Sequence, residues 1–174
     1  MLKLFNFFLD ICLLRRAPQD LPASSTLFFA VLLINVLISA VGVIDVIKNP
    51  AMALAAAMLD ATMLIIVLRL VLLIQQRSAR FLQTATALFG SASILSLLAL
   101  PLQLAVGDSS AATEPTSPII SLAYIVLIIW IQVVFGHVIR HALDISFALA
   151  IGLALSYSLI ASIIIQSLFI MPAS

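Results

Sequence analysis

The chain has 174 residues, of which 64% are hydrophobic and only 9% are charged, and its formal net charge is +1. A soluble domain carries about 25% charged residues because its surface faces water. The composition therefore excludes an ordinary soluble domain and predicts a protein whose solvent is largely lipid. A single cysteine, Cys12, also excludes an intramolecular disulfide and cannot by itself form a thiolate metal site.

The first predicted element is an amphipathic helix in the stretch LKLFNFFLDICLLRR, which begins at Leu2. Lys3, Asn6 and Asp10 recur there at spacings of three and four residues, while apolar side chains fill most of the remaining circumference. The stretch is too short to cross a bilayer, but it has the pattern of a helix that lies in the membrane interface. We expect it there, on the cytoplasmic side; the alternative is a helix that packs against the bundle.

Long runs that are poor in charge predict five membrane-spanning helices in the rest of the chain. A helix needs about 20 apolar residues to cross the hydrocarbon core, and each run is long enough. The runs also lack the two-residue alternation of a membrane β-barrel. The predicted fold is an all-α membrane bundle over residues 23–174, preceded by the cytoplasmic segment 1–22, with spans at about 25–46, 51–74, 81–103, 118–139 and 145–170.

Basic residues fall almost entirely on one side of the predicted bundle. If the N-terminus is cytoplasmic, that side receives Lys3, Arg15, Arg16, Arg77, Arg80 and Arg140. Only Lys48 lies opposite, so the positive-inside rule predicts a cytoplasmic N-terminus and an outward C-terminus, in what we expect to be a bacterial inner membrane. We expect Arg15, Arg16, Arg77 and Arg80 to contact the headgroups of anionic lipids.

Asp60 is the one acidic side chain that the predicted spans place near mid-depth in the membrane. Folding the first hairpin at Lys48 and Asn49 puts Asn35 at nearly the same depth on the neighbouring helix. A charge there is costly, so Asp60 must be protonated, paired or in contact with a wet cavity. We favour a hydrogen bond between neutral Asp60 and Asn35 that joins two helices. The alternative is a proton or cation relay.

The stretch GHVIRHALD, residues 136–144, places polar side chains in a C-terminal region that is otherwise almost wholly apolar. In one continuous helix, His137, Arg140, His141 and Asp144 would share a face, at spacings of three and four residues. The two histidines could then bind a metal ion, with Asp144 as a third ligand.

Helix length favours a turn at this stretch instead. One helix from Pro118 to Phe169 would be roughly 75 Å long at 1.5 Å per residue, more than twice the hydrocarbon thickness. Gly136 and the charged residues after it are where the chain is expected to turn, at the cytoplasmic surface. We therefore predict a tight polar turn without a metal, with Asp144 at the start of the following helix, where a negative charge suits the helix dipole.

Motifs that carry chemistry are absent from the sequence. It contains no nucleotide-binding glycine loop and no HExxH, CxxC or GxSxG motif. Its eight basic residues leave no basic stripe for a nucleic acid. We expect no enzymatic activity, no catalytic residues, no cofactor and no nucleic-acid partner.

The stretch DLPASSTLFFAVLL, from Asp20 to Leu33, resembles the start of the first span in the YIP family, the Ypt-interacting proteins. The tyrosine and glycine of that family's Asp-Leu-Tyr-Gly-Pro signature are missing here. The resemblance implies a cytoplasmic N-terminal segment, five spans, an outward C-terminus and a trafficking-type role.

Three hypotheses for function follow from these patterns. The first is a scaffold, accessory subunit or modulator of bilayer organisation that acts through lateral contacts with lipid, with another membrane protein or with a second copy of itself. The second is a small transporter or channel that uses Asp60. The third, and the least favoured, is a lipid-modifying enzyme that uses His137 and His141.

Overall fold

The computed structural model describes residues 2–111 and 118–170, and within these ranges the chain forms α-helices and no strand. The helices are α1 (Leu2–Cys12), α2 (Ser25–Ile47), α3 (Pro50–Ile74), α4 (Phe81–Ala111), α5 (Pro118–Leu143) and α6 (Phe147–Ile165). Two short 3-10 helices, η1 (Pro18–Asp20) and η2 (Ser78–Arg80), precede α2 and α4, and α6 continues into a π-helical end, η3 (Gln166–Ile170). The five helices from α2 to α6 are long and apolar enough to cross a membrane. This confirms the predicted all-α, five-span fold.

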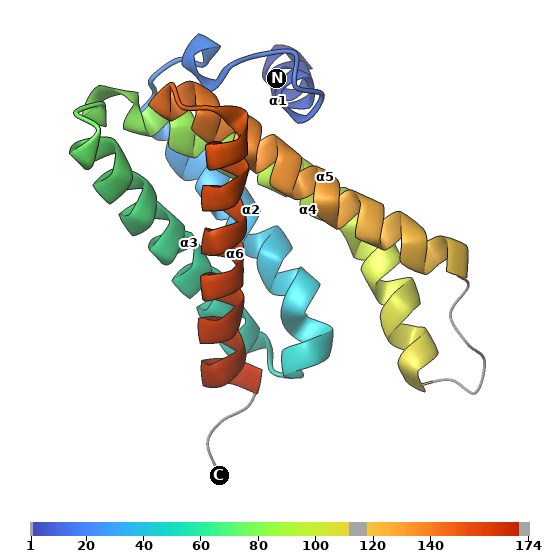
Figure 1. Cartoon of the computed structure of the whole chain (residues 1–174). Coiled ribbons are helices and arrows are strands. Elements are labelled where there is room, and N and C mark those ends of the chain that lie inside the picture. The colour runs from blue at the N-terminus through green and yellow to red at the C-terminus, as the bar shows by residue number, and fades with distance from the viewer. Residues whose placement is uncertain (1, 112–117, 171–174) are drawn as a thin grey trace.

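Figure 1 shows that the helices alternate in direction between two ends of the bundle. α1, η1, the α3–α4 turn and the α5–α6 turn gather at one end, while the α2–α3 turn and the end of α6 lie at the other. α4 and α5 run side by side and lean away from α2, α3 and α6 toward this second end. Pro101 lies inside α4, and a proline inside a helix commonly bends it.

α4 is the central helix of the bundle. It contacts α1, α2, α3 and α5, and it is the most buried of the spanning helices. Its segment Thr84–Ser91 is buried throughout and consists mainly of alanine, threonine, glycine and serine. Lipid is as apolar as leucine, so membrane helices associate through close packing of small residues rather than through hydrophobic burial. Many large apolar side chains point outward, as Ile119 on α5 and Leu159 on α6 do, while others, such as Leu88 and Phe89 of α4, are buried in the core.

Polar caps start three of the spanning helices. Ser24, Asn49 and Ser146 each accept hydrogen bonds from backbone N–H groups in the first turn, at 3.0 to 3.5 Å. These bonds satisfy donors that a helix start leaves free. Pro50 follows Asn49 at the first position of α3, where its missing N–H costs nothing.

Four of the helices are followed by a residue other than glycine whose backbone has the left-handed conformation. A left-handed backbone costs such residues about 1–2 kcal/mol, so the closing hydrogen bonds must offset strain. After α3, for example, the Arg77 N–H donates to the Leu72 carbonyl at 2.7 Å, the bond that closes a Schellman motif. The residues with positive φ are Leu14, Lys48, Gln76 and Asp144.

The turn between the last two spans lies later than predicted. α5 continues through Gly136 as far as Leu143, and the chain reverses only over residues 144–146. Asp144 is not at the start of α6: it is the left-handed residue after α5, with φ of 52°, and Ser146 caps α6. Aspartate tolerates this conformation better than most residues do, so the predicted helix-start position of Asp144 was wrong.

Gly136 has a packing role rather than a turn role. A Cβ atom at this position would lie 2.7 Å from the Ile151 Cγ1 atom and 3.3 Å from the Ile151 Cα atom on α6. The missing side chain therefore lets α5 and α6 approach closely where they cross. Gly152 on α6 offers the contrast, because a Cβ there would meet nothing within 4 Å.

α1 packs against the bundle with one face and leaves another face exposed. Phe8, Ile11 and Cys12 are buried, and the Phe8 ring fills the space beside Gly90 of α4, where a Cβ would lie 2.2 Å from the ring. Phe5 of α1 is 52% exposed, and Leu13, which directly follows the helix, is 51% exposed. The inner face of α1 therefore packs against the bundle, as the alternative prediction had it. Its outer face leaves apolar side chains exposed, where they can contact lipid.

The two glycines of the α5–α6 pair give a matched test of this packing. Gly136→Ala should destabilise the protein by about 1–3 kcal/mol, because the added methyl group overpacks against Ile151. Gly152→Ala should be neutral or stabilising by up to about 1 kcal/mol, because alanine favours a helix and space is open. Unfolding of both variants in detergent measures the difference. Equal effects of the two substitutions would contradict this account of the crossing.

Candidate functional site

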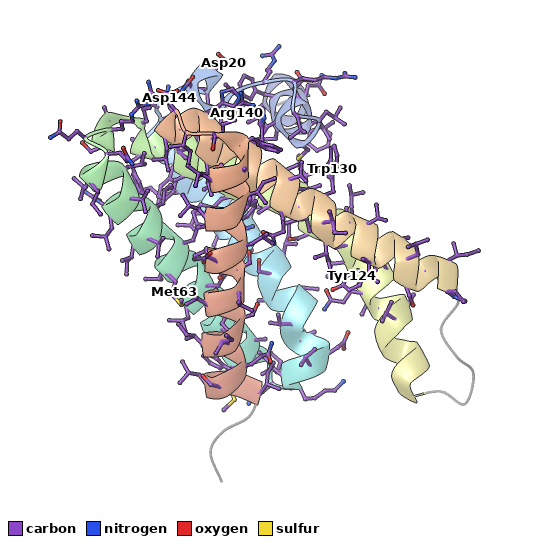
Figure 2. All side chains as sticks on the ribbon, in the orientation of Figure 1. Asp20, Met63, Tyr124, Trp130, Arg140 and Asp144 are labelled. Atoms are coloured by element: carbon purple, nitrogen blue, oxygen red, sulfur yellow. The ribbon has the colours of Figure 1, made fainter. Side chains whose placement is uncertain are left out.

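A polar cap lies at the N-terminal end of the bundle, where the α3–α4 turn meets the end of α5; Figure 2 labels Arg140 and Asp144 there. Asp144 accepts hydrogen bonds from Arg77 and from Arg80, the latter at 3.2 Å between Arg80 Nη1 and Asp144 Oδ2. Arg80 Nη1 also donates to the carbonyls of His141 and Ala142, at 3.4 and 3.3 Å. These carbonyls end α5 and lack partners inside the helix, and a cation beside them suits the helix dipole.

Two glutamines extend the cap to the N-terminal segment. Gln19 donates from Nε2 to the His141 carbonyl at 2.6 Å. Gln83 of α4 donates to the carbonyls of Gln19 and Leu21, at 3.2 and 2.8 Å. The segment that connects α1 to α2 is therefore fastened to both α4 and α5.

Two aromatic nitrogens of α5 complete the attachment. The Trp130 indole N–H donates to the Cys12 carbonyl at 3.0 Å, and His137 Nε2 lies 3.0 Å from the Arg16 carbonyl. That carbonyl can only accept, so this contact places a proton on His137 Nε2. Burial raises the pKa of the Cys12 thiol to about 11, which leaves it almost wholly protonated and unreactive at neutral pH.

The histidine pair lies on the last turns of α5 and not in the turn where it was expected. The His137 and His141 rings have centroids 4.6 Å apart, in an edge-to-face arrangement. Asp144 pairs with the arginines rather than joining the histidines as a third ligand. Within residues 2–111 and 118–170, no three His, Cys, Asp or Glu side chains come close enough to hold a metal ion.

The arginines expected at lipid headgroups divide into two groups. Arg77 and Arg80 are half-buried and bind Asp144. Arg15 is exposed, and Arg16 is exposed while pairing with Asp10 at 3.0 Å. The Arg77 hydrogen bond, aided by Arg80, holds the pKa of the Asp144 carboxyl below its ordinary value.

Asp60 and Asn35 do not pair, so that prediction was wrong. The Tyr157 hydroxyl of α6 donates to Asp60 Oδ1 at 2.8 Å and lies 3.0 Å from the Asp60 carbonyl. Asn35 instead donates to the Phe89 carbonyl of α4 at 3.5 Å. α2 contacts both α3 and α4, but Asn35 lies on the face of α2 toward α4, while Asp60 reaches Tyr157 of α6. Tyr157 was missed, although it is the most polar large side chain in the sequence of α6.

Asp60 also lines a cavity between α2, α3, α4 and α5, which we call the Asp60 cavity. Its volume is about 280 Å³. Gln103 of α4 forms part of its wall and donates to the Gly42 carbonyl of α2. Tyr124 lines it from α5, on the arm that leans away in Figure 2. The polar residues of the lining are Ser39, Asp60, Ser96, Gln103 and Tyr124, and apolar residues and Gly42 supply the rest.

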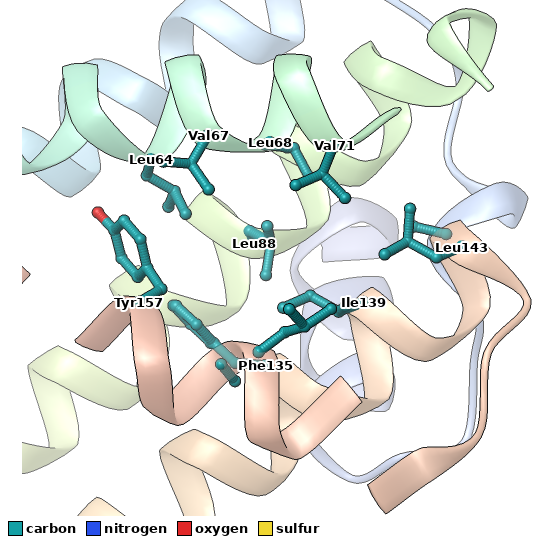
Figure 3. Close-up of a pocket in the computed structure, with 12 residues that line it drawn as sticks. Leu64, Val67, Leu68, Val71, Leu88, Phe135, Ile139, Leu143 and Tyr157 are labelled. Carbon is teal, nitrogen blue, oxygen red and sulfur yellow. The ribbon is translucent and has the colours of Figure 1, made fainter. Parts of the chain in front are cut away.

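A second cavity, shown in Figure 3, is smaller and almost entirely apolar. Its volume is about 70 Å³, and its walls include Leu68, Leu88 and Phe135. Tyr157 borders this cavity with its ring, but its hydroxyl points away from the centre. The polar chemistry near mid-depth thus belongs to the Asp60 cavity.

Comparison of the chain with protein families, curated proteins and solved structures gave no match. The resemblance to the YIP family therefore stays a prediction based on residues 20–33.

The Asp144 cluster predicts a specific acid dependence. A carboxyl whose pKa is lowered by folding stabilises the protein above its unfolded pKa, and this contribution is lost as the pH falls through the lowered value. Asp144→Asn should therefore lower the melting temperature at neutral pH and remove this loss in acid. The exposed Asp45, at the opposite end, serves as control, since Asp45→Asn should keep the acid dependence of the parent. Parallel pH curves for parent and Asp144→Asn would contradict the assignment.

Proposed function

We propose that this chain is an integral membrane protein without enzymatic activity that acts through lateral contacts, as a scaffold, an accessory subunit or a modulator of bilayer organisation. The observation that carries the proposal is the outer face of α5. Residues 118–133 of this helix include no buried side chain, so this part of its surface is available to lipid or to another helix.

The exposed side chains of α5 follow the spacing of a helix-packing seam. Ile119, Leu122, Val126 and Ile129 are separated by three, four and three residues, and their exposed fractions are 78%, 62%, 57% and 58%. A three-four repeat keeps one apolar stripe toward a partner helix crossing at about 20°. The seam therefore suits a membrane helix, from a second copy or from a different subunit.

The groups of the polar cap support a structural rather than a catalytic role. The Arg80 guanidinium, the Gln19 amide and His137 Nε2 all contact groups of the same chain. A catalytic site needs side chains that can reach a reacting group. The lipid-modifying hypothesis is correspondingly the weakest of the three.

Photo-crosslinking tests the seam. With p-benzoylphenylalanine at Val126, irradiation of native membranes should give a covalent adduct, of twice the mass of the chain for self-association or of another discrete mass for a different subunit. The matched control is Leu159 on α6, which is 63% exposed and outside the seam. Adducts of equal yield at both positions, or of lipid alone at Val126, would overturn the proposal.

We further propose a bacterial inner membrane as the location, with the polar cap on the cytoplasmic side. The arginines of the cap end support this orientation by the positive-inside rule, and the exposed Arg15 and Arg140 are placed to meet anionic headgroups. Reporter enzymes fused after Lys48 and after Gln76 should report the outer and the cytoplasmic side, respectively. The reverse assignment would refute the orientation, and identical sides would refute the hairpin of α2 and α3.

A small transporter or channel is the second candidate. The observation that favours it is the position of Asp60, which lines a cavity as well as contacting Tyr157. A carboxyl group inside a membrane span often marks an ion or substrate path.

A further inference from the structure

The Asp60 cavity contains a carboxyl group whose negative charge, when it is ionised, has no positive partner in the cavity walls. Among the described residues that line it, Asp60 is the only acidic side chain and there is no basic one. Asp60 lies about 15 Å along α3 from its first residue, Pro50, at 1.5 Å per residue, and thus deep in the membrane. A carboxylate in such a place is stable only with a proton or with a positive charge beside it.

Asp60 and Gln103 offer acceptor oxygens to the cavity, and the hydroxyl groups of Ser39, Ser96 and Tyr124 can accept as well as donate. The Tyr157 hydroxyl occupies Asp60 Oδ1, and no hydrogen bond within the described part of the chain reaches Asp60 Oδ2. The Gln103 amide donates an N–H to the Gly42 carbonyl, and its oxygen remains available as an acceptor. An ammonium group carries several N–H donors and no acceptor, so it complements these groups better than a neutral alcohol or an anion does.

The remaining walls suit an aromatic or aliphatic group attached to that cation. Leu100, Ile128 and Ile131 give the cavity an apolar side, and Tyr124 offers an aromatic ring. Cations are attracted to the faces of such rings. The volume of about 280 Å³ is near the lower limit for ligand pockets and suits a small amine rather than a whole lipid.

The position of the cavity indicates the route of its occupant. It lies between α2 and the α4–α5 arm, in the half of the bundle where the arm leans away from the other helices. An occupant that enters between helices comes from the membrane, so it must partition into lipid.

We propose that the Asp60 cavity is a binding site for a small lipophilic ammonium ion, held by Asp60 and Gln103 with its apolar part against α5. Binding requires only the cavity and the Asp60 carboxylate. The ligand is of the class that the transport candidate would carry, but binding does not require that the ligand cross the membrane or that the α5 seam have a partner.

Equilibrium binding to the full chain in detergent tests the site with three probes of one shape. The probes are 2-phenylethylammonium, neutral 2-phenylethanol and anionic 3-phenylpropionate, observed by ligand NMR or calorimetry. The cation should bind saturably, and the other two should show only the partitioning seen with empty micelles. Saturable binding of all three alike, or of none, would overturn the proposal.

Three variants connect the binding to Asp60. Asp60→Asn should weaken binding of the cation at least about tenfold, because a buried charge loses its partner. Asp45→Asn removes the same charge from an exposed position and should leave affinity unchanged. Ser39→Leu fills the cavity without altering the carboxyl group and should also abolish binding, which covers the case in which Asp60→Asn fails to fold.

Protection of the buried Cys12 thiol from maleimide reports whether each variant is folded. Unchanged affinity in folded Asp60→Asn would refute the site. Uptake of 2-phenylethylammonium into vesicles is a separate measurement: binding without uptake would reject the transport candidate and retain the site.

Discussion

The fold depends on hydrogen bonds from side chains to backbone carbonyls of neighbouring elements. Asn35 of α2 donates to the Phe89 carbonyl of α4, and Gln103 of α4 donates to the Gly42 carbonyl of α2. Trp130 of α5 donates to the carbonyl that ends α1. A helical carbonyl already accepts one bond from its own helix, but its second lone pair remains available. In lipid, where no water competes, such contacts fix which helices are neighbours and at what depth.

Close backbone approach makes these bonds reachable. The small residues of α4 bring α1 and α2 near enough, and Gly136 does the same for α5 and α6. The two devices act together, because a short side chain such as Asn35 reaches a neighbouring carbonyl only when the helices nearly touch. This explains why the helix with the lowest hydropathy among the spans, α4, is also the most buried. The interior around α4 combines small and polar residues with a few large apolar ones such as Leu88, and much of the lipid-facing surface is leucine and isoleucine.

The sequence was sufficient to predict the spans but not the partners of their polar residues. Run length and charge placement identify five crossings because lipid thickness sets the required length. Equal depth in the membrane did not identify the partner of Asn35, because every residue of a neighbouring helix also offers a backbone carbonyl as acceptor. Gly136 was ambiguous for a related reason, since glycine serves both turns and close approach. A single sequence does not distinguish these alternatives. The end of α5 is also unmarked: its Ile145 N–H donates to the Arg140 carbonyl in a Schellman motif, but Asp144 stands where glycine is usual.

The two ends of the bundle differ in how firmly they are joined, and this bears on function. At the capped end, Arg80, Gln19 and Gln83 join η1, η2, α4 and α5 through backbone carbonyls and Asp144. Toward the other end, the α4–α5 arm leans away, with the Asp60 cavity between it and α2. α5 carries the proposed seam on its outer face, while Tyr124 and Ile128 face the cavity. A partner on the seam and an occupant in the cavity would therefore act on one helix from opposite sides. If either biased the tilt of that helix, their affinities would depend on each other by the same factor in both directions. A lateral-contact protein and a ligand-binding protein are thus compatible descriptions of this bundle, joined through α5.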